Sequence, residues 1–345
     1  MTEMTRIGLD TSKAVFTLHA VNAAGAAVLR LNLRRAQLIP YFGKLPPTEI
    51  ALEACASAHH WARMLSALGH TVRLVPPQYV KAYVKRGKND RIDAAAICEA
   101  AGRPGMRFVP VKSAPRQAEA LVLKVRARLI AQRTQLINAL RGHAAEFGVI
   151  AARGTRHVGP LLTVIALSAL PDEAKTMLAL LGEQIAHLEA QLEPLERTIL
   201  AMHKANRVSQ RLATIPGIGP ITALSLALEI DPAAFRSGRH LAAWLGLTPQ
   251  ERSTGGKPRL GGISRAGNER LRALLMNGAT AVVRCARRSA GSRLATDWLR
   301  GLLQRRPPKL VVVALANKTA RIAWAVMVRG EAYRHPGARA VARAG

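Results

Sequence analysis

The sequence predicts an α/β domain at the N-terminal end, followed by long helices and a mostly helical C-terminal domain. Three patterns carry this prediction. Short segments between residues 6 and 75 have the apolar and alternating patterns of strands. Residues 112–204 repeat apolar side chains at helical spacing. After residue 207, glycine and proline turns separate further helical segments.

Residues 6–33 are expected to form three consecutive strands. The segment RIGLD is apolar and ends in an acid, VFTLHAV alternates, NAAG supplies a turn, and AVLRLNL alternates again. Residues 48–54, TEIALEA, have the apolar character of a buried strand, and they also carry an acid at their end.

Helices and strands alternate in the next part of the chain. AHHWARMLSALG is expected to be a helix closed by Gly69, and HTVRLVPP a strand stopped by Pro76 and Pro77. A helix with the basic segment KAYVKRGKND follows, and DRIDAAAICEAAG is a further helix. Three consecutive strands followed by alternating strands and helices are typical of an RNase H-like α/β domain.

A long basic helix is expected over residues 112–145, and an amphipathic helix over residues 174–204. The second helix repeats apolar residues at steps of three and four, like the a and d positions of a coiled coil. These residues are Leu178, Leu181, Ile185, Leu188, Leu192, Leu195, Ile199 and Met202. Pro194 lies among them and should kink or interrupt the helix. We expect this seam to pair subunits. The alternative is an ordinary amphipathic helix packed within its own domain.

A second compact domain is expected after residue 206. The segment RLATIPGIGPITALSLALEI predicts two helices joined by a tight turn, and LAAWLGLTP a helix that ends before Pro249. A glycine-rich loop precedes two further helices. We therefore expect a catalytic domain at 1–110, a basic helix and coiled-coil segment at 111–205, a C-terminal domain at 206–330 and a basic tail at 331–345.

The charge of the chain indicates a polyanionic partner. Lys and Arg number 51 against 21 Asp and Glu, so the formal net charge is +30. Such a charge is best tolerated when nucleic acid supplies the counter-charge. The three cysteines include no C-x-x-C pair, which argues against a zinc ribbon and a disulfide framework. No signal segment or membrane-length apolar run is seen, so the expected location is the bacterial cytoplasm.

Four acidic residues are candidates for a metal site. Asp10 and Glu53 each end an expected strand, and the first and fourth strands of an RNase H-like sheet are neighbours. Asp90 and Asp93 lie on one face at the start of a helix. Four hard oxygen donors suit Mg²⁺ or Mn²⁺, which can stabilise the oxygens of a phosphoryl transfer. The alternatives are that Asp90 and Asp93 only cap the helix, and that Asp10 is a turn residue.

Basic residues and glycines are candidate contacts to nucleic acid. Lys88 and Arg91 adjoin the acidic pair and would attract phosphate. The PGIGP turn resembles that of a helix-hairpin-helix element, in which backbone N–H groups at Gly217 and Gly219 approach a phosphate. Its alternative is a tight turn between packed helices. His59 and His60 open a helix and are left without a role.

The loop at 250–267 carries hydroxyls among cations. The basic residues there are Arg252, Lys257, Arg259 and Arg265, around Ser253 and Thr254. A hydroxyl in such a setting can attack a phosphodiester and form a covalent intermediate. Without further information, a flexible phosphate-binding loop is the preferred interpretation.

Several motifs together resemble the DEDD transposases of bacterial insertion sequences, which are described as bridge-RNA-guided recombinases. They include GLDTSK, ALEACASAHHWA, KNDRIDAAAICEA, TIPGIGPITALSLALEI, LAAWLGLTPQERSTGGKPRLGGISRAGNERLR and NKTARIAWAVM. The resemblance extends from about residue 6 to about residue 330, with the motifs in the expected order.

This resemblance implies a RuvC-like N-terminal domain, a coiled-coil linker and a C-terminal transposase domain with a serine nucleophile. The four acids of the family fall on Asp10, Glu53, Asp90 and Asp93. The serine falls on Ser253, and an alternative alignment selects Thr254. The implied partners are donor and target DNA, a structured guide RNA and further copies of the chain, as a dimer or tetramer. The rival functions are a hydrolytic nuclease or junction resolvase, and a non-catalytic nucleic-acid-binding protein.

Overall fold

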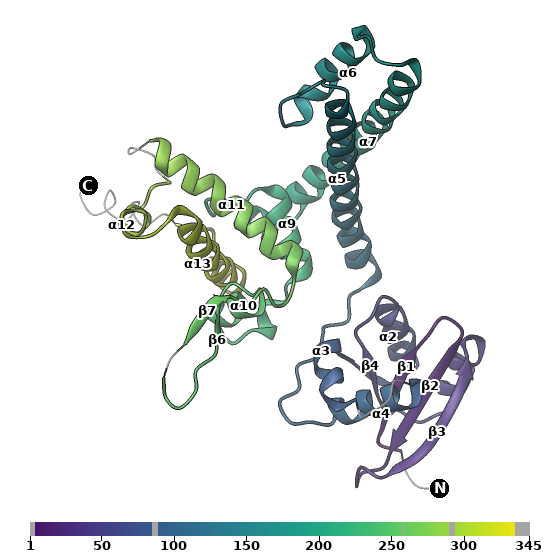
Figure 1. The fold of residues 1–345 in the computed structure, drawn as a ribbon. Helices are drawn as coiled ribbons and strands as arrows, with labels where there is room; N and C mark the ends of the chain where they lie inside the picture. The colour runs from purple at the N-terminus through teal and green to yellow at the C-terminus, as the bar shows by residue number, and fades with distance from the viewer. Residues whose placement is uncertain (1–3, 85–88, 258, 290–293, 335–345) are drawn as a thin grey trace. The chain divides into compact units, whose positions relative to one another are not determined.

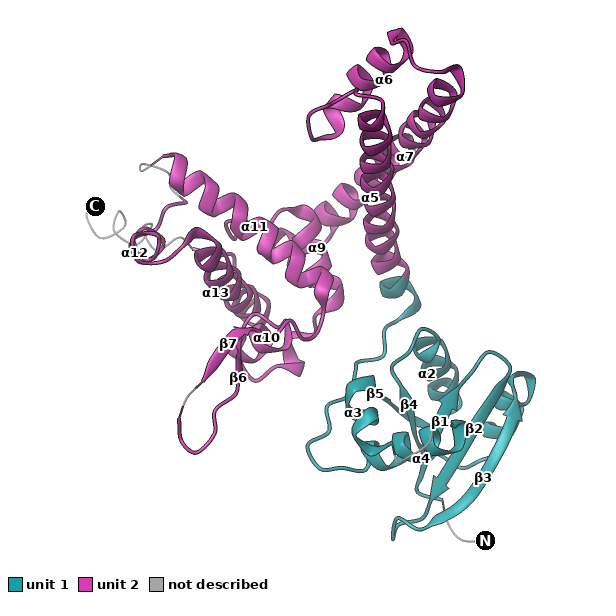
Figure 2. Ribbon diagram, in the orientation of Figure 1, with its two compact units in different colours: residues 1–117 teal, residues 118–345 magenta. Residues whose placement is uncertain are grey.

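The computed structural model describes residues 4–84, 89–257, 259–289 and 294–334 (Figure 1). The chain forms two compact units, residues 1–117 and residues 118–345 (Figure 2). The first unit contains the mixed sheet, and the second is mostly helical. The finer division of the second unit at residue 206 stays a prediction.

The first unit is built on a five-stranded sheet in the order β3-β2-β1-β4-β5. Strands β1, β2 and β3 pair antiparallel, whereas β4 pairs parallel with both β1 and β5. The strands are β1 Arg6–Thr11, β2 Val15–Val21, β3 Ala27–Arg34, β4 Glu49–Glu53 and β5 Thr71–Val75. This topology confirms the RNase H-like prediction and places β1 and β4 side by side at the centre.

One face of this sheet is apolar and carries helices α1 (Leu38–Phe42) and α2 (Ala58–Ala67). Strand alternation points Ile7, Leu9, Phe16 and Leu18 to this face, where they form one core with the two helices. The Phe16 and Trp61 rings meet edge to face, with their centroids 5.0 Å apart. The opposite alternation sends Arg6, Gly8 and Asp10 to the other face.

That other face carries helix α4 (Asp90–Ala101), which follows α3 (Pro77–Val80) and the short helix η2 (Lys81–Tyr83). A Cβ atom at Gly8 would lie 2.2 Å from the Ala94 carbonyl oxygen and 2.6 Å from the Cys98 Cβ. Glycine is therefore required where α4 crosses β1. This close crossing brings the first turn of α4 to the end of β1.

The second unit begins with two long helices, α5 (Ala114–Glu146) and α7 (Asp172–Ala205), with α6 (Val158–Leu167) between them in sequence. Arg126 pairs with Glu196 at 2.7 Å and Arg133 with Glu189 at 3.5 Å, so α5 and α7 run antiparallel (Figure 1). Of the expected kink or interruption at Pro194, the interruption is wrong, because helix α7 continues through this residue.

The apolar seam of α7 is covered within a single chain. Leu178 and Ile185 pack with residues of α5 and α6, and Ile199 packs with Leu123 of α5. The structure therefore favours packing within the domain, and the expectation that this seam pairs subunits is corrected. The physical reason is that α5 returns antiparallel beside α7 and presents its own apolar stripe to it.

The rest of the second unit is a helical core. Its helices are α8 Arg207–Ala213, α9 Pro220–Glu229, α10 Gly238–Trp244, α11 Glu269–Arg288, α12 Asp297–Arg305 and α13 Pro308–Arg329. Short 3₁₀ helices occur in this unit at η3 Thr155–His157 and η4 Pro232–Ala234, and in the first unit at η1 Arg35–Gln37. The glycine-rich loop forms a two-stranded ribbon, β6 Pro249–Glu251 and β7 Leu260–Ile263. The expected tail lies mostly outside the described residues.

Helix α13 is long and apolar enough to cross a membrane by length and composition alone. The helix also carries Lys309, Lys318 and Arg321, so it is not an uninterrupted apolar run. One stripe of the helix, including Val311, Ala316, Ala320 and Ala323, is buried in the helical core of the second unit. That burial is typical of the core helix of a globular domain.

Candidate active site

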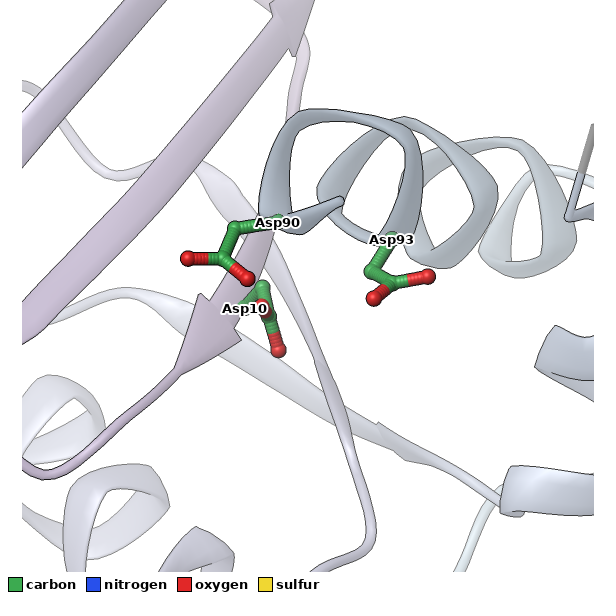
Figure 3. A group of neighbouring side chains, drawn as sticks. All are labelled: Asp10, Asp90 and Asp93. Atoms are coloured by element: carbon green, nitrogen blue, oxygen red, sulfur yellow. The ribbon is translucent and has the colours of Figure 1, made fainter. Parts of the chain in front are cut away.

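Three carboxylates converge at one edge of the first unit (Figure 3). Asp10 comes from the end of β1, and Asp90 and Asp93 come from the first turn of α4. One ligand oxygen from each lies within 4.8 Å of the others. The sequence prediction therefore placed these acids correctly at one edge, and Asp10 belongs to a strand rather than to a turn.

The helix cap of α4 leaves both of its aspartates free of a capping role. Asn89 is the N-cap, and its side-chain oxygen accepts a hydrogen bond from the Ile92 backbone N–H at 2.9 Å. Asp90 is the first residue of the helix, so the alternative in which Asp90 is the N-cap is wrong. Two carboxylates in the first turn also benefit from the positive end of the helix dipole.

The electrostatics of the cluster show that like charges are held together. Burial, followed by the charges of Asp93 and Asp90, raises the pKa of Asp10 to about 6. Glu53 adds a smaller upward contribution to the pKa of Asp10. The pKa of Glu53 is itself raised, first by burial and then by the charge of Asp93. A cation at this edge would offset the repulsion among these groups.

The residues present fit a hard divalent cation. Adjacent oxygen ligands of an octahedral Mg²⁺ ion are about 3 Å apart and opposite ones about 4.2 Å, since each bond is about 2.1 Å. The three carboxylates, with ligand oxygens within 4.8 Å of one another, would close around the ion when they bind it. The three-residue cluster does not include Glu53, although that residue ends β4 beside β1.

A side-chain contact joins the end of β1 to the segment that follows β4. The Thr11 hydroxyl and the Cys55 thiol lie 3.3 Å apart. These residues follow Asp10 by one position and Glu53 by two. The contact ties together the two strand ends that carry the acids.

His59 accepts a hydrogen bond from the Lys112 backbone N–H at 3.2 Å, which gives it a structural role.

Ser253 lies in the exposed loop that joins β6 to β7 in the second unit. Its hydroxyl donates to Glu251 at 3.0 Å and accepts from the Arg259 backbone N–H at 3.1 Å. A serine hydroxyl within hydrogen-bond reach of a carboxylate has the arrangement of a nucleophile beside a base. The backbone of Thr254 instead forms a bridge with Lys257 across the turn.

The base of the ribbon is held by the helices. The Arg272 side chain donates to the backbone oxygens of Leu245 and Ala266, at 3.1 and 2.7 Å. Asn317 donates to the Leu247 oxygen at 3.1 Å. A Cβ at Gly267 would lie 1.9 Å from the Trp244 oxygen, so only glycine allows this close approach. The base of the ribbon that carries the serine loop is therefore anchored to the helices.

Most of the basic residues that are expected to contact nucleic acid lie at the surface. Arg91 and the ribbon residues Arg252, Lys257, Arg259 and Arg265 are all exposed. Lys88 lies outside the described residues.

The two glycines of the PGIGP turn differ. Gly217 has φ +85°, and a Cβ there would lie 2.9 Å from the Gly278 oxygen on α11. Its lack of a side chain is thus explained by packing. Gly219 is exposed at the start of α9, and a Cβ at this position would meet no heavy atom within 4 Å. Packing therefore leaves the surface at Gly219 open to a ligand.

Sequence reasoning noted Glu251 as the one acid near Ser253 without pairing the two, and it missed the true cap of α4. Strand β6 ends at Glu251, and Ser253 follows in the connecting loop, so strand alternation does not explain their contact. Asn89 before a D-x-x-D pair was readable as an N-cap.

An RNase H-like sheet, with acids that converge where the central strand β1 ends beside the first turn of α4, defines the class. This is a protein with a carboxylate site suited to phosphodiester chemistry. Residues 7–148 match a family profile described as "Transposase", and residues 209–293 match one described as "Transposase IS116/IS110/IS902 family".

Relatives match over nearly the whole chain. The chain is 50% identical to a "Probable family 20 transposase" of Pseudomonas aeruginosa, over 96% of the chain and 99% of the relative. It is 40% identical to the transposase for insertion sequence element IS1328 of Yersinia enterocolitica, over 96% and 99%. It is 38% identical to the transposase for IS1111A of Coxiella burnetii, over 97% and 92%. The chain belongs to the IS110/IS116 family of insertion-sequence transposases, which are enzymes that cleave and rejoin DNA.

Proposed function

We propose that this transposase cuts and rejoins DNA with two sets of residues. Asp10, Glu53, Asp90 and Asp93 form the metal-binding carboxylate set, and Ser253 is the nucleophile. The observation that carries the proposal is the convergence of Asp10, Asp90 and Asp93, whose ligand oxygens lie within 4.8 Å of one another. The raised pKa of Asp10 accompanies this convergence. Clustered carboxylates with perturbed pKa values are typical of catalytic sites.

The serine step is written as a transesterification. The Ser253 oxygen attacks a DNA phosphorus atom, the bond from phosphorus to one strand oxygen breaks, and that strand leaves as an alcohol. Glu251 takes the serine proton, for which its 3.0 Å contact is suited. The hydroxyl of another strand end then attacks the phosphoserine, which rejoins DNA and frees the serine. Strand exchange therefore needs no net hydrolysis.

The bound metal and the basic residues have supporting roles in this proposal. Mg²⁺ or Mn²⁺ on the carboxylates would neutralise charge on the phosphodiester. The exposed cations Arg252, Lys257, Arg259 and Arg265 would hold the attacked strand, and Gly219 would offer backbone N–H groups to a phosphate. The net charge of +30 supports the proposal that the protein binds a structured guide RNA in addition to DNA. A dimer or tetramer would use surfaces other than the α7 seam.

Recombination of a donor and target DNA pair by Asp10→Asn and Glu53→Gln variants tests the carboxylate set. Each change removes an anionic oxygen donor with almost no loss of volume. We expect recombination to fall by at least about a hundredfold, with DNA binding near that of the wild type. Arg197→Gln, which alters an exposed helix pair, is the control. Full activity of either acid variant in Mg²⁺ removes that residue from the proposed set.

The same assay separates the two rival functions. A hydrolytic nuclease would release cleaved DNA without recombinant product and would keep that activity in Ser253→Ala. A non-catalytic binding protein would show neither product, and its DNA would stay intact with Mg²⁺. Sequencing of RNA that copurifies at low salt tests the proposed guide.

A further inference from the structure

A groove runs along the side of α4 and is lined by none of the four acids of the candidate site. It encloses about 720 Å³. The sheet contributes Arg6, His19 and Arg30, and α4 and its C-terminal end contribute Arg91 and Arg103. These residues come from segments that are far apart in sequence, so the sequence patterns contained no sign of the groove.

Strand register explains why the sheet residues gather there. His19 lies opposite Gly8 on β1, and Arg30 lies opposite His19 on β3. Arg6 and Asp10 point to the same face of β1 because they are four residues apart. The basic groove and the carboxylate site therefore occupy the same face of one sheet.

The groove carries positive charge that the described residues do not neutralise. Arg6 pairs with Glu49 at 3.3 Å, and Arg103 pairs with Glu99. Arg30 and Arg91 form no ion pair with any described residue. Burial, followed by the charge of Arg30, lowers the pKa of His19, so the imidazole is neutral at pH 7 and can accept or donate a hydrogen bond. The open arginines make an anion the fitting ligand.

We propose that this groove binds the backbone phosphates of the DNA strand that reaches the carboxylates. The assignment of that strand rests on the proposed function. Arg91 follows Asp90 directly, so one end of the groove lies beside the carboxylate site. Two open arginines on opposite walls, one on β3 and one on α4, suit a backbone that passes between them, because guanidinium groups bind phosphate oxygens in a forked geometry.

The length of the groove sets how many nucleotides it holds. Arg91 and Gly102 both line it, and at about 1.5 Å per residue they are about 16 Å apart along α4. A DNA strand in helical form advances about 3.4 Å per nucleotide. The groove therefore has room for about four or five nucleotides on one side of the cleaved phosphate.

The test compares Arg30→Gln with a matched charge change elsewhere in the same unit. Arg30 is exposed on the edge strand β3, so its replacement leaves the core untouched. Lys44→Gln is the control, because Lys44 is exposed after α1, on the opposite side of the sheet. Arg30→Lys keeps the charge. Binding of the full chain to a single-stranded DNA oligonucleotide is measured at several salt concentrations with EDTA present.

We expect Arg30→Gln to weaken DNA binding roughly fivefold and to lower the slope of log K against log salt by about 0.7. Arg30→Lys and Lys44→Gln should keep the wild-type slope. In oligonucleotides with one neutral methylphosphonate linkage, a discrete position should weaken wild-type binding and leave Arg30→Gln unaffected.

Three results overturn the proposal: equal losses in Arg30→Gln and Lys44→Gln, no loss in Arg30→Gln, or a loss seen only with an RNA oligonucleotide of the same sequence. Because EDTA removes catalysis, this test is independent of the carboxylate chemistry. If Asp10→Asn still recombines DNA while Arg30→Gln weakens DNA binding, the catalytic proposal fails and the groove stands.

Discussion

The position of Asp10 lowers the stability of the metal-free folded state and at the same time suits the residue for binding a cation. The apolar β1 strand delivers its carboxylate to a half-buried position beside Asp90 and Asp93. Burial and these neighbours raise its pKa to about 6, which means that ionising Asp10 costs the folded state free energy. A bound cation would reverse that cost, since it favours the ionised form.

Stability should therefore depend on pH in a defined direction. The folded pKa of Asp10, about 6, exceeds its ordinary value of 3.8, so the metal-free protein loses stability as pH rises from about 4 to about 6. We expect Asp10→Asn to remove this loss and to stabilise the metal-free protein at pH 8 by about 1 kcal/mol, after allowance for solvent screening. Thermal unfolding at pH 4 and pH 8 in EDTA measures the difference. Equal unfolding temperatures of variant and wild type at pH 8 would contradict the assigned repulsion.

The acids were predictable from sequence for a physical reason. Apolar runs that end in Asp10 and Glu53 indicate strands, and the RNase H-like order makes those strands neighbours. Arg91 was named because it adjoins the acidic pair, but its grouping with Arg6 and Arg30 could not be found this way. Arg6, Arg30 and Arg91 meet only because β3 lies two strands from β1 and because α4 crosses at Gly8, and both are tertiary facts.

At the scale of elements, the α5 and α7 pair shows the limit of periodicity. The spacing in α7 correctly predicted an apolar stripe, yet spacing cannot say which helix covers it. The structure supplies α5 of the same chain, with ion pairs such as Arg126–Glu196 flanking the contact. The β6–β7 ribbon shows the opposite limit, because glycine-rich segments carry little strand propensity and are still paired here.

Leu188→Asp tests the intrachain packing of α7. Leu188 is 9% exposed, and a carboxylate there would have no partner in an apolar interface. The expected result is a loss of about 3 kcal/mol in the free energy of unfolding, with the assembly state of the folded protein unchanged. Denaturant unfolding and light scattering provide the two readouts. A smaller assembly with unchanged stability would instead assign the seam to contacts between subunits.

At the scale of the whole molecule, the proposed function assigns different chemistry to each of the two units. The first unit contains the carboxylates and a basic groove. The second contains a serine hydrogen-bonded to a glutamate at the β6–β7 ribbon, whose base is anchored to the helices. The excess of basic residues extends over both, so nucleic acid can supply the counter-charge to each. Alternation at the start of the chain and helical spacing afterwards are local patterns, and they led to the predicted segments 1–110, 111–205 and 206–330, which stay predictions.

The most direct test of this account is detection of a covalent protein–DNA adduct. After reaction with Mg²⁺ and labelled DNA, the protein is denatured, resolved by gel and digested, and the modified peptide is identified by mass spectrometry. The account predicts a phosphoserine-linked adduct at Ser253. It also predicts loss of the adduct and of recombinant DNA in Ser253→Ala, slower adduct formation in Glu251→Gln, and near-normal behaviour in Thr254→Ala. An adduct at Thr254, or recombination by Ser253→Ala at the wild-type rate, would contradict it.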